Sequence, residues 1–252
     1  MRITVLGKSP SWPDAGGACS GYLVEDDTTR LLLDCGSGVF GRLRLVRDYA
    51  AVDAVVVSHM HADHFFDLVP YASALSYGPR THPSTPELLL PPGGREILRA
   101  ITSAGGQKDV VEDAFRVREY DVSASDRAGS LLLRFQPVPH FVPANAVELI
   151  SEGDARRFVF GADHGPSDEL VAFARDADLL MLEATLAEPE ANGRHGHLTA
   201  AEAGAHAERA NAGRLVLTHI SDELDAGHAL AEAQRAYAGP VEIAAAGASY
   251  VV

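Results

Sequence analysis

Six consecutive residues, His59 to His64, carry four side chains that could bind a metal ion. The run has the order His-Met-His-Ala-Asp-His and follows the apolar stretch Val55-Val56-Val57. Imidazole and carboxylate groups are the ligands that suit zinc and similar divalent ions. Ionisable side chains directly after a buried strand would be costly to bury without a partner. The sequence therefore predicts that this run holds one divalent ion or two.

Further side chains of the same types follow three other apolar strands. His140 comes after the strand predicted at 131–138, and Asp163 and His219 each follow a strand further along the chain. Loops at strand ends commonly carry functional groups on a rigid scaffold. Four strand ends therefore present seven side chains that could bind metal: His59, His61, Asp63, His64, His140, Asp163 and His219.

A regular order of strands and helices is needed to bring these strand ends together. Apolar runs bounded by turn residues predict strands at 2–6, 20–25, 30–34, 52–58, 87–90, 115–122, 131–138, 145–151, 157–161, 179–183, 214–218 and 241–245. Apolar residues at helical spacing predict helices at 39–49, from 65 onward, and at 96–104, 167–175, 199–210 and 222–238. The strands form two groups, each followed by helices, which indicates two face-to-face sheets with helices outside. One compact domain over residues 1–252 is the simplest organisation.

The composition limits the kinds of partner that the chain can have. Its 252 residues carry a formal net charge of −14 and have a sequence pI of about 5.1. General nucleic-acid binding relies on Lys and Arg, so this charge argues against it, whereas a small phosphorylated substrate held by metal remains compatible. Cys19 and Cys35 are too few for a disulfide-stapled scaffold and are predicted to be small core residues. No apolar run suits a signal peptide or a membrane span, so a cytoplasmic protein is expected.

The hexapeptide His-x-His-x-Asp-His resembles the signature of the metallo-β-lactamase superfamily in its binuclear form. Leu33-Asp34-Cys35-Gly36, before the first helix, and the strand-turn Gly161-Ala162-Asp163 are similar to other marks of that superfamily. The resemblance covers essentially the whole chain. It implies an α+β fold, namely the four-layer αββα sandwich of the metallo-β-lactamase type, and two divalent metal ions.

The same resemblance divides the ligands between the two ions. One ion would be held by three histidines, the second by an aspartate and two histidines, and a further aspartate would bridge both: His59, His61 and His140; Asp63, His64 and His219; and Asp163. Two ions roughly 3.5–4 Å apart can stabilise the attacking and the leaving oxygen, and zinc lowers the pKa of bound water to about 7. Zinc is expected, with manganese or iron as alternatives, since this set of nitrogen and oxygen ligands accepts all three. Asp63 could also hydrogen-bond the nucleophile, and Asp34 would either orient a ligand or cap a loop.

A narrower resemblance concerns two motifs in the last third of the chain. Leu182-Glu183-Ala184-Thr185 and Gly196-His197-Leu198-Thr199 are similar to the His-Glu-Ala-Thr and His-Ser-Thr motifs of the ribonuclease Z branch, although Leu182 and Leu198 depart from them. The resemblance implies that His197 stabilises or protonates the leaving oxygen and that Glu183 holds the tautomer and charge of His197. The alternative is a helix cap near Thr199 with an unrelated glutamate.

The substrate expectation follows from a missing segment. Ribonuclease Z enzymes have a long arm that grips transfer RNA. The arm is inserted between the strand that precedes the residue matching His140 and the bridging aspartate, which matches Asp163. In this chain the corresponding residues 141–162 are predicted to form two strands and a turn. We therefore expect a metal-dependent hydrolase, a phosphodiesterase on a small phosphodiester or nucleotide rather than on transfer RNA. The alternatives are a hydrolase of lactone, thioester or β-lactam carbonyls and a non-catalytic metal-binding protein. A homodimer is compatible with the resemblance.

The remaining histidines carry weaker expectations. His164 and His195 would either contact the substrate or serve their loops. His82, His206 and His228 are predicted to lie at the surface.

Overall fold

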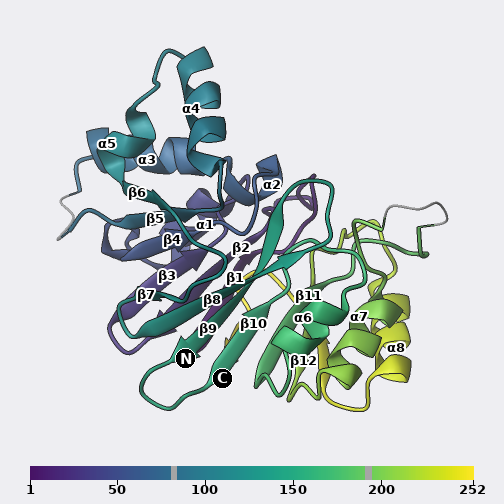
Figure 1. Cartoon of the computed structure of the whole chain (residues 1–252). Coiled ribbons are helices and arrows are strands. Elements are labelled where there is room, and N and C mark those ends of the chain that lie inside the picture. Colours follow the sequence, from purple (N-terminus) through teal and green to yellow (C-terminus); the bar gives the residue numbers. More distant parts are fainter. Residues whose placement is uncertain (81–83, 191–194) are drawn as a thin grey trace.

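The protein is described by a computed structural model that covers residues 1–80, 84–190 and 195–252. Within these residues, two seven-stranded sheets pack face to face, and helices cover the outer face of each sheet (Figure 1). The predicted αββα arrangement of layers is therefore confirmed.

The first sheet contains most of the N-terminal half and the last strand of the chain. Its strand order is β14 (Ser249–Val251), β1 (Arg2–Gly7), β2 (Gly21–Asp26), β3 (Thr29–Leu33), β4 (Ala54–Val56), β5 (Glu87–Leu90) and β6 (Arg116–Glu119). Its helices are α1 (Val39–Val46), the 3-10 turn η1 (Tyr49–Ala51), α2 (Ala62–Phe65), α3 (Leu68–Tyr77), α4 (Gly94–Ala104) and α5 (Val110–Ala114). Strands β3 to β6 run parallel to one another.

The second sheet is built in a similar way from the C-terminal half. Its strand order is β13 (Val241–Ile243), β12 (Leu215–Thr218), β11 (Leu179–Glu183), β10 (Arg157–Phe160), β9 (Ala144–Ser151), β8 (Leu131–Val138) and β7 (Asp126–Ala128). Its outer face packs against α6 (Asp168–Phe173), α7 (Ala200–Arg209) and α8 (Ala226–Ala236). Strands β10 to β13 are parallel, and β7 to β10 are antiparallel.

Burial explains why several strands have unbroken apolar sequences. Every residue of β4, β11 and β12 is buried, because one face of each strand packs against the other sheet and the opposite face packs under helices. In β11, Met181 belongs to the core between the sheets, and Leu180 and Leu182 belong to the core under the helices. β8 lies where one face is more open, so its buried and accessible residues alternate.

The parallel strands bring their C-terminal ends to one edge of the molecule. β3 and β4 end there in the first sheet, and β10, β11 and β12 end there in the second. The two sheets also touch at this edge, since His59 forms a β-bridge with Ala144 and the backbone N–H of Asn145 donates to the carbonyl of Ser58 at 3.3 Å. Loops from both sheets are therefore held next to one another.

Three residues at this edge have a left-handed backbone that side chains disfavour. Asp34 follows β3 with φ 58°, Ala162 follows β10 with φ 57°, and His219 follows β12 with φ 51°. A non-glycine residue in this region costs of order 1–3 kcal/mol, and such residues cluster at functional sites. Each turns the chain sharply at the end of its strand.

The boundaries that differ from the sequence expectations are short or interrupted elements. The helix predicted from residue 65 onward is α3, which begins at Leu68; the short helix α2 before it was not predicted, and the N–H of Asp67 between the two donates to the carbonyl of Cys35 at 3.0 Å. Pro70 lies in the first turn of α3, where a missing N–H is tolerated. The strand predicted at 115–122 ends at Glu119, and α5, β7 and β14 were not predicted because three to five residues show too little periodicity.

Two further properties concern the cysteines and membrane insertion. Cys19 and Cys35 are free and buried, as expected for small core residues. Among the described helices, none has the length and apolar character that crossing a membrane requires.

The histidines that were predicted to lie at the surface divide into three cases. His228 is exposed, and His82 lies outside the described residues. The prediction for His206 is wrong, because this side chain is only 5% exposed. Its Nδ1 donates to the carbonyl of Glu202 at 2.7 Å, and its Nε2 accepts from the backbone N–H of Ser167 at 3.0 Å. His206 therefore joins α7 to the start of α6.

This burial predicts a pH-dependent contribution of His206 to stability. Burial lowers the pKa of His206 below its usual 6.5, so below that pH the unfolded chain takes up a proton that the native imidazole resists, and stability falls. In His206→Gln we expect a smaller loss of stability between pH 7 and pH 5 than in the wild type. At pH 8 the variant should be less stable by about 1 kcal/mol, since a well-fitted hydrogen bond is lost.

Urea unfolding at pH 8, 7, 6 and 5 measures both effects. The control is His228→Gln, since His228 is exposed and should not change the acid response. An acid response of His206→Gln equal to that of the wild type would contradict the assignment.

Candidate metal centre

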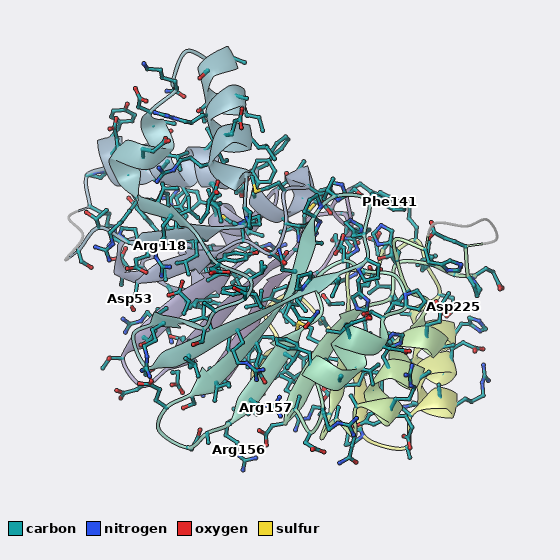
Figure 2. All side chains as sticks on the ribbon, in the orientation of Figure 1. Asp53, Arg118, Phe141, Arg156, Arg157 and Asp225 are labelled. Atoms are coloured by element: carbon teal, nitrogen blue, oxygen red, sulfur yellow. The ribbon has the colours of Figure 1, made fainter. Side chains whose placement is uncertain are left out.

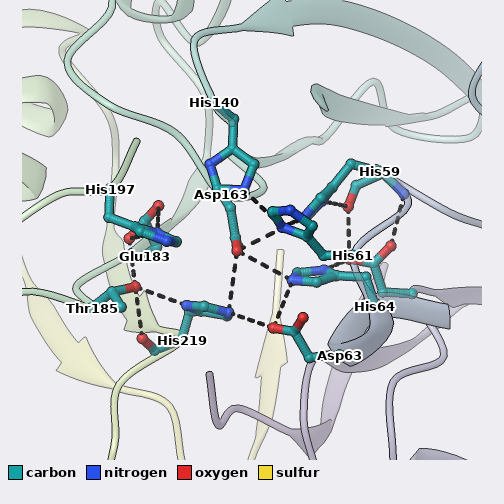
Figure 3. Close-up of polar contacts among 12 residues, drawn as sticks. His59, His61, Asp63, His64, His140, Asp163, Glu183, Thr185, His197 and His219 are labelled. Carbon is teal, nitrogen blue, oxygen red and sulfur yellow. Dashed lines mark hydrogen bonds and ion pairs between the residues drawn. The ribbon is translucent and has the colours of Figure 1, made fainter. Parts of the chain in front are cut away.

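The seven candidate ligands converge at the common edge of the two sheets, as Figure 3 shows. His59 and His61 lie in the loop after β4, Asp63 and His64 lie on the short helix α2 that follows, and the others follow β8, β10 and β12. Their potential ligand atoms form two groups, and within each group these atoms lie within 4.8 Å of one another. The groups are His59, His61, His140 and Asp163, and Asp63, His64, Asp163 and His219.

Asp163 is the residue that the two groups share. Its Oδ2 lies 3.3 Å from Nε2 of His64, 3.3 Å from Nε2 of His219 and 3.8 Å from Nε2 of His59. One oxygen therefore faces histidines of both groups. A carboxylate that bridges two ions would need such a position.

Four of the five candidate histidines have the same orientation. Each forms a hydrogen bond through Nδ1 and leaves Nε2 for the centre; the pairs are His59 with Ser58 Oγ (3.1 Å), His64 with Asp34 Oδ2 (2.7 Å), His140 with the Gly196 carbonyl (2.7 Å) and His219 with Thr185 Oγ1 (2.8 Å). His61 instead presents Nδ1, which lies 3.3 Å from Nε2 of His59 and 3.0 Å from Nε2 of His140. Such outer contacts fix the tautomer and ring orientation that a ligand needs.

Asp34 contacts both a candidate ligand and the neighbouring loop, so both of the roles that the sequence left open have a contact to support them. It is fully buried and accepts hydrogen bonds from the backbone N–H and the hydroxyl of Ser58 as well as contacting His64. The neighbouring backbone is packed closely, because a Cβ on Gly36 would lie 1.8 Å from the carbonyl oxygen of Asp63. The segment after β3 therefore packs against the loop and the helix α2 that carry four of the candidate ligands.

The residues fit a cation by two observations. Nε2 of His64 is buried and lies 3.3 Å from Asp163 Oδ2 and 3.4 Å from Asp63 Oδ2, but among the described residues it makes no hydrogen bond of good geometry. Asp34, Asp63 and Asp163 are all buried beside it. Burial works to lower the pKa of His64, but the charges and hydrogen bonds of Asp163 and Asp34 raise it well above its usual value. The carboxylates thus demand positive charge at this point, which a divalent ion supplies more fully than one proton.

The pKa values of the other groups are consistent with ligation. Burial, with its histidine neighbours, lowers the pKa of His59 well below its usual value, so the ring is neutral as a ligand must be. Burial acts to raise the pKa of Asp63, but hydrogen bonds from His219 and His64 outweigh it and hold it far below its usual value. The pKa of Asp163 is likewise held low against burial, chiefly by His219 and His64.

Glu183 and His197 form the pair that their motifs indicated. Nδ1 of His197 lies 2.9 and 3.0 Å from the two carboxylate oxygens of Glu183. Burial lowers the pKa of His197, but the hydrogen bond and charge of Glu183 more than offset this and raise it overall. Glu183 therefore contacts the second motif directly, through His197. Thr199 of that motif also caps α7, through a capping box with Glu202.

Exposure identifies the side from which a substrate can approach. Among the candidate ligands, His61 and His140 are partly exposed and the others are buried, and His197 is also partly exposed. Phe141, labelled in Figure 2, is 45% exposed. Its ring centroid lies 5.8 Å from that of His197. Its ring packs against Gly196, where a Cβ would lie 2.3 Å from ring atoms. The open face of the centre is therefore bordered by His197 and Phe141.

The remaining two histidines of uncertain role have structural positions. His164 is fully buried, and burial lowers its pKa to about 4. Its backbone N–H donates to Glu183 at 2.7 Å, so it serves the loop rather than the open face. His195 is exposed, and its backbone carbonyl packs closely against Gly165.

Three contacts to the candidate ligands were not predicted. They come from Ser58, Thr185 and the carbonyl of Gly196. Ser58 directly precedes the histidine run and Thr185 belongs to a motif, so the sequence offered a reason to consider both residues. The contact of Gly196 could not be predicted, because any residue type has the backbone carbonyl that makes it.

Comparisons with known proteins identify the family of this chain. Residues 29–220 match the Beta-lactamase superfamily domain. The probable metallo-hydrolase YhfI of Bacillus subtilis is 32% identical over 98% of this chain and 98% of its own length. Ribonuclease Z of Halorubrum lacusprofundi is 30% identical over 95% of this chain and 93% of its own length.

Solved structures share the fold. The crystal structure of the metallo-beta-lactamase fold protein YhfI from Bacillus subtilis has a TM-score of 0.88 at 28% identity, and the match covers 99% of this chain and 98% of that one. The short form of human tRNase Z has a TM-score of 0.76 at 22% identity, covering 100% of this chain and 99% of that one.

The chain therefore belongs to the metallo-β-lactamase superfamily. It is a member of the ribonuclease Z-like branch, and the segment between His140 and Asp163 contains β9, β10 and turns rather than a long arm. The αββα sandwich is the fold of this superfamily. The family implies a hydrolase that uses divalent metal ions.

The contacts of Asp34 predict a loss of metal affinity in Asp34→Asn. Asparagine tolerates the left-handed backbone, but its amide would place a donor against Ser58 or His64. We expect metal binding weakened by about 10- to 100-fold, as is typical for outer contacts of metal ligands. Competition with a chromophoric chelator measures the affinity.

A matched control is Asp53→Asn. Asp53 is exposed and accepts from the backbone N–H of Arg30, remote from the centre. Its variant should bind metal with wild-type affinity. Equal affinities for Asp34→Asn and the wild type would show that Asp34 does not support the centre.

Proposed function

We propose that this chain is a binuclear metal-dependent phosphodiesterase that acts on a small phosphodiester or nucleotide. The observation that carries the proposal is the His197–Glu183 pair at the open face of the candidate metal centre. A hydrolase of carbonyl compounds does not require such a pair, whereas a diester with a poor leaving group needs a proton donor at the leaving oxygen.

Seven side chains would hold the metal ions. His59, His61 and His140 would hold one ion, Asp63, His64 and His219 would hold the second, and Asp163 would be shared. When bound, a pair of divalent ions supplies an activated water and stabilises the charge that develops on the attacking and leaving oxygens. Zinc suits this ligand set best, with manganese or iron as the other candidates.

The chain's own side chains supply proton transfer and orientation. The hydrogen bond of His197 Nδ1 to Glu183 leaves Nε2 free to donate a proton to the leaving oxygen. Asp63 contacts His64 and His219 through Oδ2, so its Oδ1 is the oxygen that would accept a hydrogen bond from the nucleophilic water. Glu183 holds the tautomer of His197 and stabilises its charge.

The size and charge of the chain support a small substrate. Residues 141–162, all of them described, contain only β9, β10 and turns, so no arm extends from this segment to hold transfer RNA. The net charge of −14 also disfavours a long polyanion. The relative named Ribonuclease Z supports phosphodiester chemistry, and the difference in this segment supports a smaller substrate.

We also propose that residues 1–252 work as one domain. Candidate ligands follow strands of both sheets, and Asp163 from the second sheet lies within 3.8 Å of His59 and His64 from the first. Neither sheet alone would contain a complete site.

The proposal predicts that His197→Ala depends on the leaving group. A diester with an alcohol leaving group, such as a dinucleotide, should lose about 10²–10⁴-fold in kcat, the range typical of general acid catalysis. Bis(p-nitrophenyl) phosphate should lose much less, because p-nitrophenolate leaves without a proton. Initial rates of the metal-loaded enzyme with both substrates measure the difference.

The alternatives give different results in the same assay. Turnover of lactones or thioesters by the wild type with no turnover of diesters would overturn the proposal in favour of a carbonyl hydrolase. Equal losses of kcat for both diesters in His197→Ala would show that His197 does not protonate the leaving oxygen.

A further inference from the structure

The hydroxyl of Thr185 contacts both the candidate ligand His219 and the carboxylate of Glu183, as Figure 3 shows. Its Oγ1 is 2.5 Å from Glu183 Oε2, 2.8 Å from His219 Nδ1 and 3.1 Å from the His219 carbonyl. Thr185 follows the end of β11 by two residues, and His219 directly follows the neighbouring parallel strand β12. The side chain thus joins two adjacent strand ends.

The direction of these hydrogen bonds follows from the number of protons. A hydroxyl has one proton to donate, and Glu183 has only acceptor oxygens when it is ionised. Glu183 also receives the backbone N–H groups of His164 (2.7 Å) and Leu198 (3.2 Å), which an ionised carboxylate satisfies. The 2.5 Å contact has the length of a charge-assisted hydroxyl–carboxylate bond. Thr185 therefore donates to Glu183.

The remaining lone pairs of the Thr185 hydroxyl then determine which ring nitrogen of His219 carries the proton. Since the hydroxyl proton points to Glu183, Nδ1 of His219 must carry the proton and donate to Thr185. Nε2 of His219 is consequently the nitrogen with a free lone pair. It faces the centre, 3.1 Å from Asp63 Oδ2 and 3.3 Å from Asp163 Oδ2.

The same carboxylate that receives the Thr185 proton also holds His197. One continuous chain of hydrogen bonds therefore runs from His219 through Thr185 and Glu183 to Nδ1 of His197. We propose that Thr185 is a positioning residue that orients the ligand His219 and the proton donor His197 together, through its simultaneous contacts with His219 and Glu183. The part that concerns His197 rests on the proposed function, whereas the part that concerns metal affinity does not.

The test compares Thr185→Val with Thr185→Ser. Valine has nearly the shape of threonine but no hydroxyl, so His219 loses the acceptor for its Nδ1–H, and Glu183 loses a donor. Zinc affinity, measured by competition with a chromophoric chelator, should fall by about 10- to 100-fold for one of the two ions. Thr185→Ser keeps the hydroxyl and should restore the affinity. Thr185→Ala serves if the valine variant does not fold, as judged by circular dichroism.

The matched control is Thr218→Val. Thr218 is the register partner of Glu183 on β12, is buried, and bonds the hydroxyl of Tyr22 at 2.6 Å. This variant also removes one hydroxyl at the same level of the sheet, but not from a contact with a candidate ligand. It should lower the melting temperature without changing zinc affinity. Wild-type zinc affinity in Thr185→Val, or equal losses in Thr185→Val and Thr218→Val, would overturn the proposal.

A double-mutant comparison tests the link to His197. At saturating zinc, Thr185→Val should lower kcat for a dinucleotide when His197 is present and should have little further effect in the His197→Ala background. The same fold loss of kcat in both backgrounds would overturn the joint orientation. If the wild type hydrolyses no diester, the proposed function fails, and the zinc affinities alone still decide whether Thr185 positions His219.

Discussion

The structure depends on the compensation of buried negative charge at one point between two sheets. Asp34, Asp63 and Asp163 are all at most 6% exposed, and their charges have the imidazoles of the site as nearest neighbours. Removing one partner from buried charges leaves an uncompensated ion, which is strongly destabilising. A pair of divalent cations would satisfy the carboxylates and would also bind Nε2 of His64, which lies between Asp63 and Asp163 without a hydrogen bond of good geometry. The residues around the centre therefore form a buried, negatively charged site that is suited to binding cations.

The fold brings the candidate ligands around these carboxylates because the strands that precede them end close together. Parallel strands in both sheets end at one edge, and Asp34, Ala162 and His219 take left-handed backbone conformations there. This strain persists because the surrounding contacts determine it, and it turns the chain where a candidate ligand or its support must face the centre. Hydrogen bonds to the outer nitrogens then fix four histidine rings, so the geometry exists before any substrate binds.

Much of this organisation could be predicted from the sequence because it is recorded in local patterns. Apolar runs located β4, β8, β10 and β12, and polar residues just beyond them identified the groups that converge. The resemblance supplied the shared position of Asp163. Interactions that depend on tertiary packing could not be found in this way: the burial of His206 between α6 and α7, the carbonyl of Gly196 behind His140, and the direction of the Thr185 hydroxyl. None of these changes the periodicity of the chain.

The location of bound metal tests the central claim most directly. Crystals of the zinc-loaded protein, measured at the zinc absorption edge, should show two anomalous peaks per chain. One peak should lie among His59, His61 and His140, the other among Asp63, His64 and His219, with Asp163 between them. A zinc-loaded crystal without anomalous density at this edge of the sheets would contradict the account, because the buried carboxylates would then be compensated in another way.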